Sequence, residues 1–337
     1  MIRWLKILRY SFVFTLLIVT SAFGQEDDYT QYYLNLPGVN PGFTGMDDFL
    51  DLKTGLREGW NSFGVKNNNT YISAYRTINS TSRSGHRNNS LRLSNPNLFN
   101  EVLADKKFRR RHGLGGMITN RTVGPYRSFG VGMNYSYHLP ISRKLTVSLG
   151  TRAGYTNQRI DFINLNVRNE INDLFYQSLL RSGQGTQNSL LIDFGTVLYS
   201  NRFFLGLSTS NGITKKMNGD QLFEMNDEPS FKVQTSVIFP LNSEFDLFPG
   251  LISTYSNSHD LIWLTNLRLR YKKLVYLGTA YGSEKMSLLF GLSTTNLTVN
   301  YAYDMYTSNE NNFNINTHEL VMGLTLFNKH KLRPRFW

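Results

Sequence analysis

The sequence predicts an all-β protein, a single antiparallel transmembrane β-barrel of about 14 strands that follows a turn-rich N-terminal arm. Three observations predict this fold: a long hairpin with two different faces at 128–156, a composition rich in aromatic residues and glycine, and short turns that alternate with long loops along the chain. A leader that would carry the chain out of the cytoplasm agrees with them.

The clearest hairpin spans residues 128–156. Large apolar side chains alternate with small or polar ones over 128–139 and again over 145–156, and this period of two indicates strands. Each strand runs roughly 11 residues, the length that crosses a bilayer at a tilt of about 45°. The polar face carries Gly, Ser, Thr, Asn and Arg152, which suits a wet lumen better than a dry core. A soluble sheet with one face in water is the alternative for this hairpin taken alone.

The composition fits a barrel with aromatic belts and a lumen lined by small residues. Aromatic residues make up 14% of the chain and charged residues 18%, and there are 27 glycines. The mean hydropathy of −0.32 does not argue against this fold, because a transmembrane barrel is apolar at only half of its positions.

The charge is basic, at a formal +12, or +9 once the three basic residues of the leader are removed. No helix carries the charge as a stripe and no nucleic-acid-binding motif is present, so nucleic acid is not a predicted partner. Anionic outer-membrane lipid or an acidic protein is the better reading. The absence of cysteine excludes a disulfide framework, a thiolate metal site and a lipid-anchored cysteine.

Residues 1–24 have the organisation of a secretory signal peptide. Three basic residues precede the apolar run 12–19, and Ala22 and Gly24 are the small residues that a cleavage site before Gln25 requires. A retained helix is the alternative, but the run is shorter than the roughly 20 residues that a span needs. No later run of 18 apolar residues exists, so the exported chain would cross a membrane as a barrel, in the outer membrane of a Gram-negative bacterium.

Residues 25–48 are predicted to form the arm, either as a plug or on the periplasmic side. Pro37 and Pro41 occur there with three glycines, a density that favours neither strand nor helix. We therefore expect an ordered, turn-rich arm or a linker.

Within this arm, residues 30–45 resemble the opening signature of the PorP/SprF family of the type IX secretion and gliding machinery, approximately T-Q-Y-x-x-N-P-x-x-x-N-P-A-Y-A-G. The matching positions are Thr30, Gln31, Tyr32, Asn35, Asn40, Pro41 and Gly45. The sequence departs from the pattern where Pro37 is displaced by one position and where residues 42–44 replace Ala-Tyr-Ala.

Further short motifs follow in the order of that family. Residues 57–64, around Trp60, resemble its R-x-Q-W-x-G-F segment, with Gly59 and Ser62 in place of the Gln and the Gly. The proline that is usual after this tryptophan is missing from 65–69. The other matching segments are 112–116, 123–125, 135–139, 204–208, 301–304 and 318–319.

The resemblance implies a non-enzymatic outer-membrane component of the type IX secretion and gliding machinery, without a cofactor. Such a component assists the secretion or surface attachment of specific substrates. The implied partners are a secreted or surface adhesin-like protein with a C-terminal sorting domain and a periplasmic peptidoglycan-associated secretion component. Candidate partner contacts are the motif residues Gln31, Tyr32, Asn35, Asn40, Pro41, Gly45 and Trp60.

Alternation marks the barrel within 49–327, followed by a C-terminal tail at 328–337. Besides the two strands of the hairpin, strands are expected at 49–57, 70–78, 114–120, 190–199, 203–208, 231–239, 245–255, 261–271, 274–283, 285–293, 297–304 and 318–327. Counted from a periplasmic start, short turns fall on the periplasmic side and the long loops 157–189, 209–230 and 305–317 fall outside. This agreement favours a barrel over a sandwich.

One periplasmic connection, 79–113, is long. It carries the basic cluster Lys106, Lys107, Arg109, Arg110 and Arg111. A solvated charge run or a missed strand pair near 91–93 would explain it, and the sharper hypothesis is a docking loop for a periplasmic component. In the loop 157–189, residues 166–180 have a spacing typical of a short amphipathic helix that caps or enters the barrel, or of a plain loop helix.

The charged residues expected in the lumen have both signs, so ion pairs and a tucked-in arm are expected to fill it. These residues are Asp51, Lys53, Arg57, Arg152, Asp193, Lys232, Arg268, Arg270, Asp304 and Glu319. We expect Asp51 and Lys53 to pair with Glu319 across the seam between the first and last strands.

Enzymatic and metal-binding signatures are weak. Ser136 and His138 share one face of a strand, but any pair two residues apart does so, which makes this a weak signature. A lipid-hydrolysing barrel is a further alternative, and it would require both residues. The six histidines show no metal-ligand spacing. The main alternative function is an outer-membrane channel or porin for small solutes.

Overall fold

The computed structural model describes residues 29–60, 67–78, 110–142, 144–161, 177, 185–219, 228–257, 261–283, 285–306, 316–328 and 334–337. The expected signal peptide, the basic residues Lys106, Lys107 and Arg109, and the expected loop helix apart from residue 177 lie outside these residues.

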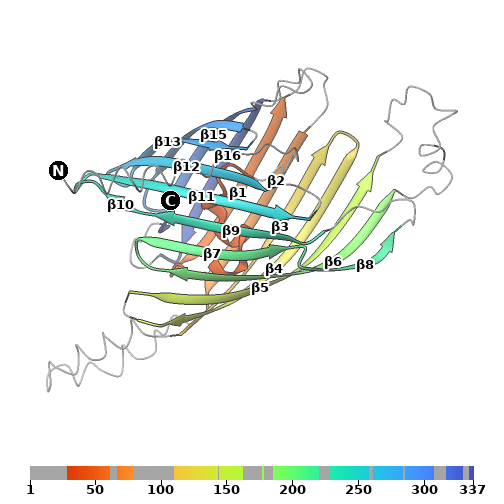
Figure 1. The fold of residues 1–337 in the computed structure, drawn as a ribbon, viewed down its shortest axis with the longest axis horizontal. Helices are drawn as coiled ribbons and strands as arrows, with labels where there is room; N and C mark the ends of the chain where they lie inside the picture. Colours follow the sequence, from red (N-terminus) through yellow and green to blue (C-terminus); the bar gives the residue numbers. More distant parts are fainter. Residues whose placement is uncertain are drawn as a thin grey trace.

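Fourteen strands of the described chain close into one antiparallel barrel (Figure 1). They are β1 Leu50–Trp60, β2 Asn67–Thr77, β3 Arg111–Val123, β4 Tyr126–Pro140, β5 Thr146–Ile160, β6 Thr186–Tyr199, β7 Phe203–Ser210, β9 Ser230–Val237, β11 Phe245–Ser256, β12 Ile262–Tyr271, β13 Val275–Gly282, β14 Lys285–Ser293, β15 Leu297–Tyr306 and β16 Asn316–Leu326. Two further strands, β8 Ile213–Gly219 and β10 Phe239–Pro240, pair with β6 and β11.

The barrel closes because β16 pairs with β1 over its whole length, from Leu50 opposite Leu326 to Trp60 opposite Asn316. Strand β9 completes the ring, because it pairs with β7 on one edge and with β11 on the other. The predicted single antiparallel barrel of about 14 strands is confirmed.

The two faces of the wall are inverted relative to a soluble protein. Along β14, Leu288 and Leu292 are 50% and 45% exposed on the outside, whereas Ser287 and Ser293 are buried inside. The same inversion holds in the predicted hairpin, where Met133 and Leu149 are exposed and Asn134 and Ser148 are buried. An outer surface of large apolar side chains around polar interior groups is the pattern of a barrel in lipid. Among the described residues, no helix is long and apolar enough to cross a membrane.

The expected external loop 209–230 is wrong in part, because it contains β8. Strand β6 has 14 residues and β7 only eight, so the far half of β6 needs another partner. After a turn in which Asn211 adopts a φ of 57°, residues 213–219 supply it. The expected strand 231–239 is divided into β9 and β10.

The two ends of the barrel differ. We call the end at which β16 finishes the tail end; its short connections are 141–145, 200–202, 241–244, 272–274 and 294–296. The longest connection, 78–110 between β2 and β3, also lies at the tail end. The opposite end, the loop end, holds the long connections 161–185 and 307–315, and β3 and β4 are joined there by Gly124 and Pro125 alone.

Candidate functional site

The arm lies inside the barrel. Residues 30–37 and 40–46 are all buried, and in Figure 1 the arm is the orange coil within the outline of the strands. It contains three short helical turns, η1 Tyr32–Asn35, α2 Leu36–Val39 and η2 Pro41–Phe43. The expectation of no helix in this segment is therefore wrong, because Pro37 and Pro41 occupy first-turn positions, where a helix does not need their missing N–H.

A buried carboxylate holds the start of the arm. Both oxygens of Glu319 in β16 accept backbone N–H groups, from Thr30 and from Gln31, each at 2.9 Å. The Thr30 hydroxyl donates to Asp304 in β15 at 2.7 Å. Hydrogen bonds to ionised acceptors are the strong ones, so this contact fixes the arm to the wall.

Two cations neutralise Asp304. Arg57 in β1 lies 3.2 Å from its carboxylate and Lys285 in β14 lies 3.3 Å from it. Asp304 is fully buried, and a buried charge is tolerated only when it is paired and hydrogen-bonded. The lumen charges therefore form ion pairs with one another, as expected, and one of these clusters meets the arm.

The expected pairing of Asp51 and Lys53 with Glu319 is wrong. The register places Asp51 opposite Thr325, far along β16 from Glu319. Instead, Lys53 bonds to Asp51 on its own strand at 2.7 Å.

Polar side chains of β4 and β5 hold the far part of the arm through its carbonyl groups. Arg152 donates to the carbonyls of Pro37 and Gly38, each at 2.7 Å, and Ser148 donates to that of Gly42. Ser136 and His138 both donate to the Thr44 carbonyl. The pair considered as catalytic therefore serves as an anchor for the arm.

Glycines in the wall make room for this part of the arm. A Cβ atom on Gly150 of β5 would overlap the carbonyl of Pro41, and one on Gly195 of β6 would overlap the Asn40 side chain. A Cβ atom on Gly113 of β3 would overlap the Thr44 carbonyl. The arm thus lies directly against the backbone of three strands, a contact that side chains at these glycines would prevent.

The arm residues singled out by the sequence all meet in the lumen. Gln31 accepts from the Tyr276 hydroxyl at 3.2 Å, and Tyr32 accepts from Asn266 at 2.9 Å. Asn35 contacts Met117, and Asn40 donates to Gln234 at 3.1 Å and caps η2 by accepting from Gly42. Pro41 begins η2, and Gly45 has a φ of 69°.

The other predicted residues lie elsewhere. Trp60 ends β1 at the loop end, opposite Asn316. Arg110 is exposed just before β3, and Arg111 begins β3 and donates to the Tyr199 hydroxyl at 3.1 Å.

An aromatic and cationic stack packs the middle of the arm. The Arg268 guanidinium lies 3.4 Å from the centre of the Tyr33 ring, a cation–π contact. Burial raises the pKa of Tyr33 to about 12 against the opposing effect of the Arg268 charge. The Tyr33 phenol stays protonated and lies 3.1 Å from the Tyr276 hydroxyl.

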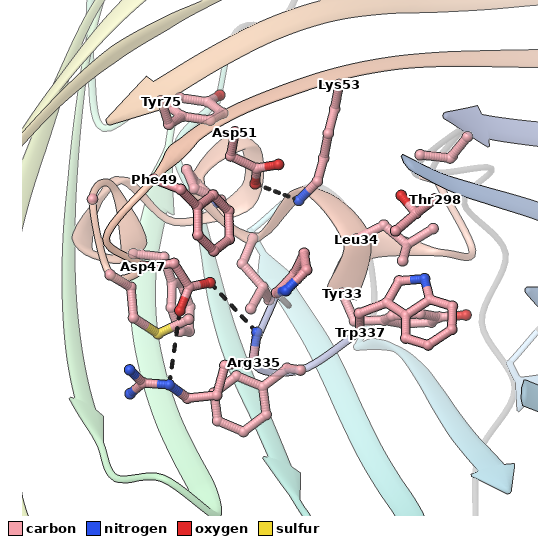
Figure 2. A pocket seen from close by; sticks show the side chains of 18 of the residues that line it. Tyr33, Leu34, Asp47, Phe49, Asp51, Lys53, Tyr75, Thr298, Arg335 and Trp337 are labelled. Atoms are coloured by element: carbon pink, nitrogen blue, oxygen red, sulfur yellow. Dashed lines mark hydrogen bonds and ion pairs between the residues drawn. The ribbon is translucent and has the colours of Figure 1, made fainter. Parts of the chain in front are cut away.

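The C-terminal tail enters the lumen as well, which the sequence did not indicate. Phe336 and Trp337 are buried at the tail end, against the arm and the wall. Figure 2 shows Trp337 beside Tyr33 of the arm. Arg335 lies 3.8 Å from Asp47 of the arm, and this ion pair is drawn in the same view.

Arm and tail together leave little open space. The cavity between them in Figure 2 measures 40 Å³, and two others beside the arm measure 50 Å³ and 150 Å³. Pockets for small molecules are roughly 300–1,000 Å³, so these three spaces are large enough for water but smaller than a typical small-molecule pocket. Among the described residues, no group of three or more His, Asp or Glu side chains is placed to hold a metal ion.

Comparison with known proteins assigns the chain to a family. Residues 21–324 match the model of the type IX secretion system membrane protein PorP/SprF. No curated protein matches the sequence significantly.

Solved structures resemble the chain at low identity. A variant of the monoaromatic hydrocarbon channel TodX is 12% identical, with 91% of this chain and 96% of that chain covered at a TM-score of 0.48. The outer membrane protein Omp33 of Acinetobacter baumannii is 8% identical, with coverage of 83% and 99% and a TM-score of 0.44. The Pseudomonas putida toluene transporter TodX is 12% identical, with coverage of 91% and 95% and a TM-score of 0.43. These likenesses carry no argument about function.

Proposed function

The chain belongs to the PorP/SprF family of type IX secretion system membrane proteins, and from this premise we propose that it is a non-enzymatic outer-membrane component of the type IX secretion and gliding machinery. It assists the secretion or surface attachment of specific substrates and recognises an adhesin-like protein through its C-terminal sorting domain. The barrel sits in the outer membrane of a Gram-negative bacterium after cleavage behind Gly24, with the tail end toward the periplasm.

The observation that supports this role over a porin is the filled lumen. A porin needs a continuous aqueous path, and here the arm is bonded to strands around the barrel, from Glu319 in β16 to Ser136 in β4. A barrel closed in this way contributes a membrane-embedded surface to an assembly. The family motif, Gln31 to Gly45, then holds the plug in place, and partners contact the rims.

Pull-down of the intact protein from its own envelope tests the role. We expect one large secreted or surface protein with a C-terminal sorting domain to co-purify, and its recovery to depend on that domain. Recovery that is unchanged after the domain is deleted would contradict substrate recognition.

Conductance separates the proposed role from the porin alternative. Purified protein in planar bilayers is expected to stay closed, because the three cavities beside the arm, among the residues that the structure describes, measure 40, 50 and 150 Å³. Steady open-channel currents from the unaltered protein would favour the porin.

The basic cluster before β3 is our proposed docking site for the periplasmic peptidoglycan-associated component. The informative variant neutralises Lys106, Lys107, Arg109 and Arg110 but keeps Arg111, because Arg111 also bonds to Tyr199 of the wall. Exposed ion pairs are worth about 0.2–1 kcal/mol each, so losing four of them is expected to weaken co-purification roughly tenfold.

The control for this variant is a separate pair of basic residues at the tail end of the barrel. Lys272 and Lys273 lie exposed in the turn between β12 and β13, and changing both to alanine is expected to leave co-purification intact. An equal loss in both variants would mean that general charge, and not this cluster, attracts the partner.

A further inference from the structure

The tail is held in the lumen through its backbone. Arg268 donates to the backbone oxygen of Phe336 at 3.1 Å, and Arg270 donates to the backbone oxygen of Trp337 at 2.9 Å. Both arginines come from β12 and are almost fully buried. Two guanidinium groups, two residues apart on β12, therefore contact the backbone oxygens of two consecutive residues.

The two aromatic side chains of the tail each have a place of their own. The Phe336 ring packs edge to face on Phe204, with centroids 4.7 Å apart. The Trp337 ring packs on Tyr276 at 5.3 Å, and its indole N–H donates to Asn300 at 2.7 Å. Aromatic slots combined with one specific donor–acceptor pair are the features by which proteins recognise short peptides.

The attachment of the tail differs from that of an ordinary core segment. Only residues 334–337 of the described tail enter the lumen. Arg335, at the edge of the lumen, is partly exposed; it makes an ion pair of 3.8 Å and a backbone hydrogen bond of 3.4 Å with Asp47. One buried nitrogen of Arg268, Nη2, has no hydrogen-bond partner although the side chain is only 1% exposed. The tail thus leaves one donor of Arg268 without a hydrogen-bond acceptor, and a 40 Å³ cavity lies beside the tail.

We propose that Arg268, Arg270 and Asn300 form a peptide-recognition site for a segment with two consecutive aromatic residues. Phe336 and Trp337 occupy this site in cis. A partner segment of the same chemistry that reaches the tail end exchanges with them. The proposal goes beyond the secretion role, because it rests on the observed contacts of the tail and does not depend on that role.

A labelled peptide of residues 331–337 (Lys-Leu-Arg-Pro-Arg-Phe-Trp) tests it on full-length protein in detergent micelles by fluorescence anisotropy. The double variant Phe336→Ala/Trp337→Ala empties the site and is expected to bind the peptide at least tenfold more tightly than the unaltered protein, in which the tail competes. Adding Asn300→Ala to the emptied chain is expected to weaken binding roughly tenfold, because the indole N–H loses its acceptor.

Four results decide the proposal. The recognition site is overturned if the variant Phe336→Ala/Trp337→Ala keeps the heat-modifiable migration of a folded barrel on gels but does not bind the peptide. It is also overturned if a peptide with alanine at both aromatic positions binds as tightly as the peptide of residues 331–337. An unaltered protein that never exchanges its tail for the peptide overturns exchange. A second peptide keeps Phe-Trp but replaces the residues before it with unrelated ones. Binding of this peptide supports recognition of a partner segment. Its failure to bind would restrict the site to the protein's own tail and would overturn the exchange with a partner.

Discussion

The variant Gly150→Ala is expected to conduct ions in planar bilayers where the unaltered protein stays closed. The added Cβ atom would overlap the Pro41 carbonyl. A small local shift of the arm cannot relieve this overlap, because Ser148 and Arg152 on the same strand hold Gly42 and Gly38 on either side, so the bound state as a whole is destabilised. Overpacking of this kind costs about 1–3 kcal/mol, which shifts the balance between the bound and released arm by roughly 5–150-fold. Gly195→Ala, which meets Asn40, is expected to act in the same direction.

The matched control for this prediction is Gly154→Ala. Gly154 lies on the same strand and the same face as Gly150, but its added Cβ atom would find its nearest neighbour at 3.4 Å, an ordinary contact. We expect this variant to remain closed. Equal currents from Gly150→Ala and Gly154→Ala would mean that the lumen glycines do not seat the arm.

The variant Glu319→Ala is expected to release the start of the arm. Its carboxylate accepts the N–H groups of Thr30 and Gln31, and both donors would be left buried without it. An unsatisfied buried donor costs about 1–3 kcal/mol, so the variant is expected to raise the exposed fraction of the arm by at least roughly tenfold. Glu319→Gln keeps one acceptor oxygen and is expected to give an intermediate effect.

Thiol labelling measures this release, because the chain has no cysteine of its own. Leu34→Cys places a single thiol in the buried arm, and its rate of reaction with a maleimide reports exposure. Glu244→Ala is the control, since it removes only an exposed ion pair with Lys272 and is expected to leave labelling slow. An unchanged labelling rate in Glu319→Ala would contradict the anchoring role of this carboxylate.

The barrel could be predicted from the sequence because its wall follows a local rule. Every second residue of a strand faces lipid, so alternation alone identified strands such as β14, and the direction of Asp304 and Glu319 followed from it. The arm has no such periodicity. Its place against Gly150 and Gly195 depends on contacts between residues more than 100 positions apart, which no local pattern records.

The errors have the same origin. Asp51 and Lys53 were expected near Glu319 because all three face the lumen close to the seam, but facing the same side does not fix the register. Strand β8 was missed because Lys215 and Lys216 interrupt its alternation, and it forms because β6 extends beyond β7. The tail gave no signal beyond two aromatic residues, Phe336 and Trp337, after a basic stretch.

Hydrogen exchange of the arm in lipid nanodiscs tests the central claim, that residues 30–46 are seated inside a lipid-embedded barrel. Because Thr30 and Gln31 donate to a buried carboxylate and the arm is enclosed by the wall, we expect their amides to exchange at least about a hundredfold more slowly than those of the free peptide. Exchange of residues 30–46 at the rate of a free peptide, in protein that is inserted and folded, would show that the arm lies outside the lumen and would contradict the account.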